Sequence, residues 1–168
     1  MKPKQILLGV ETAKELCILA HAGQFRRDGV TLYSSHPIAV AALLETPGQK
    51  IVGLLHDLIE DTSAQLILNM DSPTSLIVFK GVEYVLSTPN AMSIYLLTKP
   101  EGVTSYMVYI KEHLIHTQWA YPRRPWIEDA AKMALKVKLA DMFHNMSSGS
   151  DKQKAKYLKA MPLVLAAL

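Results

Sequence analysis

One short apolar segment, Gly53–Thr62, carries four titratable side chains close together. His56 and Asp57 are adjacent, and Glu60 and Asp61 follow one helical turn later. Residues four apart share a face of a helix, so a helix through this segment would gather all four groups at one end. Burying a carboxylate is costly unless it is paired, hydrogen-bonded or bound to metal, and the segment contains no Lys or Arg. A bound cation accounts for this pattern, and solvated acids at a helix end with one satisfied histidine are the alternative.

Asp141 is another carboxylate inside an apolar helical pattern. Lys138 precedes it by three residues and Asn145 follows it by four. An ion pair between Asp141 and Lys138 is therefore the alternative to a metal-binding role, because residues three and four apart meet on a helix surface. His144 lies on a neighbouring face of the predicted helix, and we interpret it as a packing histidine.

His36, Arg26 and Arg27 lie in or beside a polar stretch, residues 24–35, that lacks a helical period. The two arginines could contact an anionic ligand, and solvated surface charge is the alternative. Two imidazoles, of His36 and His56, and two carboxylates form a mixed nitrogen and oxygen ligand set. Such a set suits Mn²⁺, Fe²⁺, Co²⁺ or Zn²⁺ better than a thiolate site, which the single cysteine could not build.

Apolar residues recur at three- and four-residue steps through most of the chain, and this periodicity predicts helices. The predicted helices cover about residues 4–22, 36–45, 49–61, 74–86, 92–98, 104–113, 126–146 and 151–168. We find no strand-type alternation of useful length, no internal repeat and no linker. The expected fold is one all-α domain over residues 1–168, a helical bundle with the metal site in its core.

Composition narrows the classes of partner and compartment. The net charge is +3, from 18 basic and 15 acidic residues, which is too mild to predict a nucleic-acid partner. No apolar run is long enough for a membrane span, and the apolar stretch before Glu11 is too short for a secretory signal. The lone cysteine fits a reducing compartment. We expect a cytoplasmic protein that acts on a small molecule, and a homo-oligomer stays open.

Four motifs, in this order, resemble the HD superfamily, most closely the hydrolase domain of RelA/SpoT-type alarmone enzymes and their small single-domain relatives. The matching segments are His21–Gly29, Tyr33–Pro37, Leu54–Thr62 and Lys138–Asn145. Leu96–Gly102 is similar to the family's segment before the last motif. The similarity covers most of the chain, and the combined set of motifs is far more specific than a lone His-Asp pair.

The resemblance implies a hydrolase that removes pyrophosphate from the 3′ position of ppGpp or pppGpp, or of an adenosine counterpart, leaving GDP or GTP. It implies a divalent metal, usually Mn²⁺, bound by His36, His56, Asp57 and Asp141. It implies that Glu60 and Asp61 orient and deprotonate the attacking water. It assigns nucleotide contacts to Arg26, Arg27, Asn145 and Ser148, with Lys99 and Lys138 as weaker candidates for phosphate contacts.

The chain also departs from the family pattern. Val30–Leu32 replaces a shorter family segment, and Met142–Ser148 lacks polar groups that are usual there. These departures leave open an HD phosphohydrolase acting on another nucleotide, such as NADPH at its 2′-phosphate or a nucleoside mono- or triphosphate. A nucleotide-binding, antitoxin-like protein without turnover is the third hypothesis. Residues 116–126 resemble an insertion, interpreted as a lid or an interface.

Overall fold

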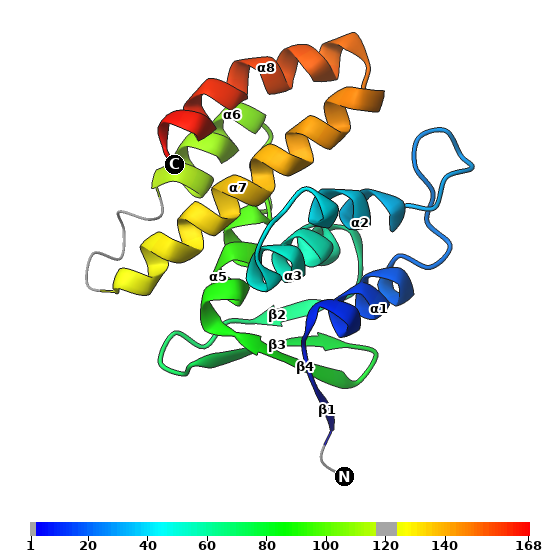
Figure 1. The fold of residues 1–168 in the computed structure, drawn as a ribbon, viewed down its shortest axis with the longest axis vertical. Helices are drawn as coiled ribbons and strands as arrows, with labels where there is room; N and C mark the ends of the chain where they lie inside the picture. The colour runs from blue at the N-terminus through cyan, green and yellow to red at the C-terminus, as the bar shows by residue number, and fades with distance from the viewer. Residues whose placement is uncertain (1–2, 117–123) are drawn as a thin grey trace.

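The structure is a computed structural model that describes residues 3–116 and 124–168. Most of the predicted insertion at residues 116–126 therefore lies outside the described residues. Figure 1 shows the helices stacked above a small sheet, with β1 leading down to the N-terminus and α7 packed along α8. In chain order the elements are β1 (Lys4–Leu7), α1 (Val10–Ala20), α2 (Ser35–Ala42), α3 (Pro47–Leu55), α4 (Leu58–Asp61), β2 (Gln65–Ile67), β3 (Thr74–Phe79), β4 (Val82–Ser87), α5 (Thr88–Leu97), α6 (Tyr106–Val108), the π-helical η1 (Tyr109–Ile115), α7 (Pro125–Ser148) and α8 (Asp151–Ala166).

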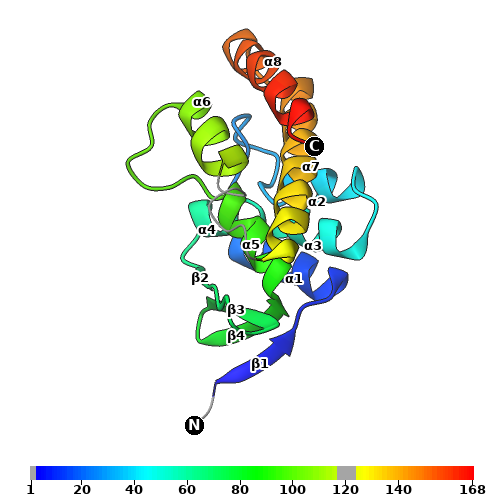
Figure 2. The ribbon, with the colours of Figure 1, turned by 90° about the vertical axis from the view of Figure 1, so that its left-hand side faces the viewer.

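The four strands form one mixed sheet in the order β1-β4-β3-β2. β1 runs parallel to β4, and the other two pairings are antiparallel. The sheet lies at the base of the molecule beneath the helices, and α5 packs against β3 and β4 (Figure 2). The chain is therefore an α/β protein, and the predicted all-α fold is wrong.

The region predicted as a helix over residues 74–86 is a β-hairpin. Ile77 and Phe79 of β3 and Tyr84 of β4 are buried, while the residues between them are more exposed, which is the period of two that a strand requires. The turn is Lys80-Gly81, and both residues have positive φ, 48° and 77°. Two consecutive positive φ values match the right-handed twist of a hairpin, and glycine adopts one at no steric cost. The Lys80-Gly81 turn between two apolar runs was the available signal in the sequence, and the helical interpretation missed it.

Other element boundaries also differ from the prediction. The helix predicted from residue 4 begins at Val10, because residues 4–7 pair with β4 and the side-chain oxygen of Thr12 accepts a hydrogen bond from the Gly9 amide. The helix predicted over residues 49–61 is interrupted after Leu55, so that α3 and α4 are separate. By contrast, α7 and α8 confirm the two predicted C-terminal helices.

Helix α7 lies at the centre of the helical layer and contacts α2, α3, α5 and α8. Ala130, Ala131 and Ala134 are completely buried on it, and small side chains let neighbouring helices approach closely. The hydroxyl of Ser93 on α5 donates to the backbone oxygen of Ala130 at 2.8 Å, which ties α5 to α7 inside the core. A polar residue on the inner side of α7 must consequently find its partners within the protein.

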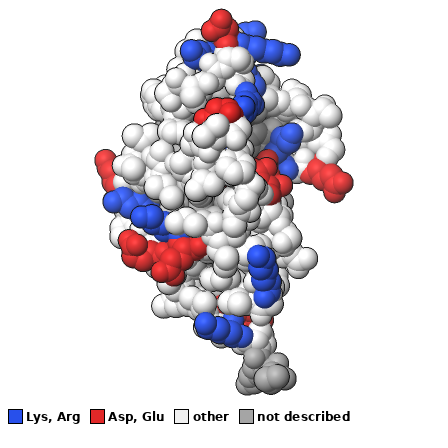
Figure 3. Space-filling view, turned by 90° about the vertical axis from the view of Figure 1, so that its right-hand side faces the viewer, with Lys and Arg blue, Asp and Glu red and all other residues white. Residues whose placement is uncertain are grey.

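Charges do not gather on the face drawn in Figure 3. Basic and acidic side chains are interspersed there, with wide uncharged areas between them. Among the described residues, the structure contains no helix with the length and hydrophobicity that a membrane crossing requires.

Candidate metal centre

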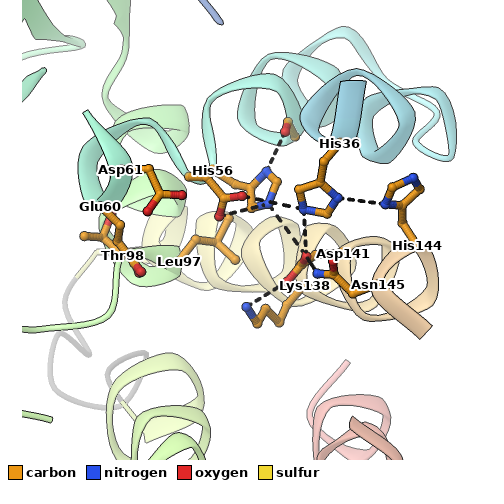
Figure 4. Close-up of polar contacts among 12 residues, drawn as sticks. His36, His56, Glu60, Asp61, Leu97, Thr98, Lys138, Asp141, His144 and Asn145 are labelled. Atoms are coloured by element: carbon orange, nitrogen blue, oxygen red, sulfur yellow. Dashed lines mark hydrogen bonds and ion pairs between the residues drawn. The ribbon is translucent and has the colours of Figure 1, made fainter. Parts of the chain in front are cut away.

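Three buried side chains from distant parts of the chain converge in the helical layer (Figure 4). His36 lies in the first turn of α2, His56 directly follows α3, and Asp141 lies on α7. One nitrogen or oxygen atom of each lies within 4.8 Å of the others, a spacing that a metal ion could bridge. Their exposed fractions are only 1%, 2% and 4%. Because α2 and α3 pack against each other and both contact α7, the start of α2 and the end of α3 meet beside Asp141.

Asp57 completes the predicted set of four. Its Oδ1 atom lies 3.2 Å from His56 Nε2, and its Oδ2 atom lies 3.5 Å from His36 Nε2. The hydroxyl of Tyr33 lies 2.8 Å from that Oδ2 atom and 2.6 Å from a carboxylate oxygen of Asp61. Tyr33 thus links the carboxylate beside the histidines to one of the two predicted catalytic acids.

The hydrogen-bonding of the two ring nitrogens of His56 shows whether these residues fit a cation. Its Nδ1 atom is 2.7 Å from the backbone oxygen of Gly53, which can only accept, so Nδ1 carries a hydrogen. Its Nε2 atom is buried and has no hydrogen-bond partner among the described residues, yet Asp57 and Asp141 oxygens lie 3.2 and 3.8 Å away. A lone pair facing two carboxylates is unfavourable unless a proton or a cation lies between them. The donor set therefore fits a divalent transition metal.

Without a metal, protonation takes the place of the cation. Burial alone would disfavour a charge on His56, but the carboxylates of Asp57 and Asp141 outweigh it and raise the pKa of His56 to about 10. Burial opposes ionisation of Asp141 as well, but Lys138 and the two imidazoles hold its pKa well below the usual range. A metal ion must displace a proton to enter this centre.

Asp141 has further partners on its own helix. The ammonium group of Lys138 lies 2.9 Å from its Oδ2 atom, and the amide of Asn145 donates to its Oδ1 atom at 2.5 Å. The Asn145 oxygen in turn accepts from Arg26 at 3.3 Å. The local ion pair weighed for Asp141 is therefore present, but it coexists with the histidine contacts instead of replacing them. Asn145, predicted to contact the nucleotide, also connects Asp141 to the arginine loop.

His144 is a site residue that the sequence interpretation missed. Its Nδ1 atom lies 2.7 Å from Nδ1 of His36, and the two ring centroids are 4.8 Å apart. Burial, together with the nearby charges of His36 and Arg26, lowers the pKa of His144. Its position three residues after Asp141 on one helix was the available signal, since such residues are neighbours on the helix surface.

A cleft of about 600 Å³ opens beside the centre. The cleft is lined by every predicted catalytic and substrate-binding residue, namely Arg26, Arg27, Glu60, Asp61, Asn145 and Ser148. Lys99 and Lys138 line it as well. His36, Asp57 and Asp141 reach the cleft from the metal centre. Its remaining wall includes Tyr106, Tyr109, Lys156 and Tyr157, and the last two, on α8, belong to no motif that the sequence displayed.

Arg26 and Arg27 lie on a small hairpin whose turn is fixed by hydrogen bonds. The backbone amide of Arg26 donates to Thr31 at 2.7 Å, and Gly29 takes a positive φ of 71° at the turn. The pKa of Asp28 is lowered to about 2 because the Thr31 hydroxyl and the amides of Val30 and Thr31 donate to its carboxylate. The hairpin therefore presents Arg26 to the cleft on an ordered backbone.

Glu60 lies on the short helix α4, directly after the interrupted helix. The backbone amide of Lys99 donates to its carboxylate. Burial raises the pKa of Glu60, although the Lys99 amide and the charge of Lys138 oppose this change. A carboxylate whose pKa is shifted toward neutrality is a stronger base than an ordinary one, and this property suits proton abstraction from water.

Lys156 adds a positive charge to the wall on α8. Its ammonium group lies 4.3 Å from the ring centroid of Tyr106 and 4.5 Å from that of Tyr157. Burial, and repulsion from Lys138, lower the pKa of Lys156. The cleft thus combines several carboxylates with lysine and arginine side chains. This combination suits a negatively charged ligand that also binds a metal ion.

The comparisons with known proteins agree with this chemistry at a coarse level. No family model matches the chain. Over 153 residues it is 28% identical to the guanosine-3′,5′-bis(diphosphate) 3′-pyrophosphohydrolase of Spiroplasma citri. The match covers 88% of this chain and 18% of that protein, so the chain spans less than a fifth of the length of the curated relative it matches. The similarity favours a hydrolase as the general class.

Proposed function

We propose that this protein is a metal-dependent nucleotide phosphohydrolase that removes the 3′-pyrophosphate of ppGpp or pppGpp. One observation carries the proposal: a buried histidine and aspartate centre opens into the same cleft as a pair of acids and a set of cationic side chains. The similarity to a protein named for this reaction supports the substrate class.

In this proposal His36, His56, Asp57 and Asp141 hold the metal, with Mn²⁺ as the expected ion. When bound, the metal would polarise the phosphoryl group and acidify water. Glu60 receives the proton of the attacking water, and Asp61, held by Tyr33, orients that water. The water oxygen bonds to phosphorus, the bond from phosphorus to the 3′ oxygen breaks, and the ribose oxygen takes up a proton. The products are GDP or GTP and pyrophosphate.

The cationic residues bind and orient the nucleotide. Arg26 and Arg27 present guanidinium groups, which pair with phosphate oxygens and also stack on bases. Ser148 and Asn145 offer hydroxyl and amide groups from the end of α7. Lys99 and Lys156 bring further positive charge to the cleft wall. Positioning of this kind supplies much of the rate enhancement in phosphoryl transfer.

The test uses protein loaded with Mn²⁺ and ppGpp labelled in its 3′-diphosphate, with release of labelled pyrophosphate as the measurement. Glu60→Gln should lower turnover by about 10²-fold or more while Mn²⁺ stays bound, because it removes a positioned base. Glu112→Gln is the matched control: its side chain is 64% exposed on η1 and pairs with His116, away from the cleft. It should hydrolyse ppGpp like the unmodified protein.

The outcomes separate the three hypotheses. Release of pyrophosphate that depends on Glu60 supports the proposal. Consumption of NADPH or of a nucleoside mono- or triphosphate, with ppGpp untouched, would refute the substrate and favour the second hypothesis. Tight nucleotide binding with no turnover of any nucleotide would refute the enzymatic role and favour a binding protein.

A further inference from the structure

The contact between His36 and His144 has a feature that fixes where hydrogens can lie. The two Nδ1 atoms are 2.7 Å apart, so one carries a hydrogen and the other a lone pair. His36 lies in the first turn of α2, whereas His144 lies near the end of α7, so the contact joins two elements that are far apart in the sequence. Two lone pairs, or two hydrogens, could not be held at this distance.

The other nitrogen of His36 determines the direction of this hydrogen bond. Its Nε2 atom lies 3.1 Å from an Asp141 oxygen and 3.5 Å from an Asp57 oxygen, so Nε2 is the atom that faces the metal centre. A neutral imidazole that binds a metal through Nε2 carries its hydrogen on Nδ1. That hydrogen points at Nδ1 of His144, which must then accept it with a lone pair.

We propose that His144 is a positioning residue for the metal centre: its Nδ1 atom accepts the Nδ1 hydrogen of His36 and holds Nε2 of His36 toward the metal. This inference rests on the metal centre of the proposed function but not on the identity of the nucleotide. The other imidazole of the centre has an equivalent partner, because Nδ1 of His56 donates to the backbone oxygen of Gly53 at 2.7 Å. In each of the two imidazoles, Nδ1 is thus held by a hydrogen bond while Nε2 faces the centre. The partner is a backbone oxygen for His56 and a side chain for His36.

The role of His144 can be tested by substitution because it depends on a side chain. A backbone oxygen such as that of Gly53 cannot be removed in this way. Partners that fix a metal-binding histidine typically change metal affinity 10- to 100-fold when they are removed, because the ring loses its tautomer and its orientation. His144 is half-buried, so a change there does not open a cavity in the core. His, Asn and Phe also have similar helix propensities, so replacements among them do not by themselves perturb α7.

The experiment is calorimetric titration with Mn²⁺ alone, in the absence of nucleotide. His144→Phe removes the acceptor and should weaken Mn²⁺ binding about 10- to 100-fold. His144→Asn places an amide oxygen near the position of Nδ1 and should recover most of that loss. His116→Phe, at an exposed histidine on the end of η1, should bind Mn²⁺ like the unmodified protein. Thermal unfolding of each metal-free variant checks that it is folded.

A second measurement needs no variant. With diamagnetic Zn²⁺ bound, ¹⁵N NMR of the imidazoles should show a hydrogen on Nδ1 of His36 and none on Nδ1 of His144. Equal Mn²⁺ affinity for His144→Phe and the unmodified protein, or equal weakening by Phe and Asn, would overturn the inference. A hydrogen on Nδ1 of His144 in the Zn²⁺-bound protein would overturn it independently. Failure to release pyrophosphate from ppGpp would refute only the substrate, because neither measurement involves a nucleotide.

Discussion

Replacing Lys138 by Met tests how the buried centre is balanced electrostatically. The Lys138 ammonium group lies 2.9 Å from Oδ2 of Asp141, and the two side chains are 12% and 6% exposed. Removing one partner of a buried ion pair costs about 3–5 kcal/mol, because the other charge is left behind. Asp141 keeps its contacts with His36 and Asn145, so we expect the lower value, about 3 kcal/mol, in the metal-free protein. For a chain of this size the melting temperature should fall by about 6–12 °C.

The same replacement should strengthen Mn²⁺ binding. Lys138 neutralises part of the charge of Asp141 that a cation would otherwise use, and its removal also removes a repulsive positive charge. If the variant is destabilised without metal but not with it, the difference in unfolding free energy must appear as tighter Mn²⁺ binding. Each 1.4 kcal/mol of this difference lowers the dissociation constant for Mn²⁺ about tenfold. Lys138→Met is therefore expected to be less stable than the unmodified protein without metal and closer to it with saturating Mn²⁺.

The matched control is Lys132→Met on the same helix. Lys132 lies 2.8 Å from Glu128, but these side chains are 45% and 65% exposed, and such a pair contributes about 1 kcal/mol or less. Calorimetric unfolding with EDTA and with Mn²⁺, together with Mn²⁺ titrations, measures both effects. Equal melting temperatures for the two variants, or weaker Mn²⁺ binding by Lys138→Met, would refute the electrostatic reasoning.

Three more predictions concern the centre and the core beneath it. Tyr33→Phe removes the hydroxyl that contacts the carboxylates of Asp57 and Asp61, and should weaken Mn²⁺ binding about tenfold by calorimetry; unchanged affinity would show that this hydroxyl positions neither acid. Mn²⁺ at a hundred times its dissociation constant should raise the free energy of unfolding by about 2.7 kcal/mol, and Asp141→Asn should remove this gain; stabilisation that survives in Asp141→Asn would place the ion elsewhere. Burial, with a smaller effect of Asp57, raises the pKa of the Cys17 thiol from 9.0 to about 12. Because the thiol ionises more easily in the unfolded protein, its contribution to stability is complete below pH 9 and is lost as the pH rises toward 12. Between pH 8 and 10.5 the free energy of unfolding should therefore fall by about 2 kcal/mol more in the unmodified protein than in Cys17→Ala, as measured by urea unfolding. Identical pH dependence in both proteins would contradict this.

Local patterns in the chain were sufficient to predict the long C-terminal helices and most of the residues that gather in the centre. Asp141 and the adjacent pair His56 and Asp57 stand out because ionisable groups in apolar segments need partners. The order of the motifs led to His36 as well, and the structure brings all four side chains together. The assignment of these four as metal ligands stays a prediction until metal binding is measured.

Packing between distant segments decided the rest. Residues 74–86 contain enough apolar side chains to satisfy a helical pattern, and only pairing with β1 and β2, together with the left-handed turn at Lys80-Gly81, selects the hairpin. The role of His144 depends on the distance from α7 to α2, and the basic wall at Lys156 depends on where α8 lies. Contacts of this kind join residues separated by a hundred positions or more, as between His36 and His144, and no local periodicity encodes such a distance.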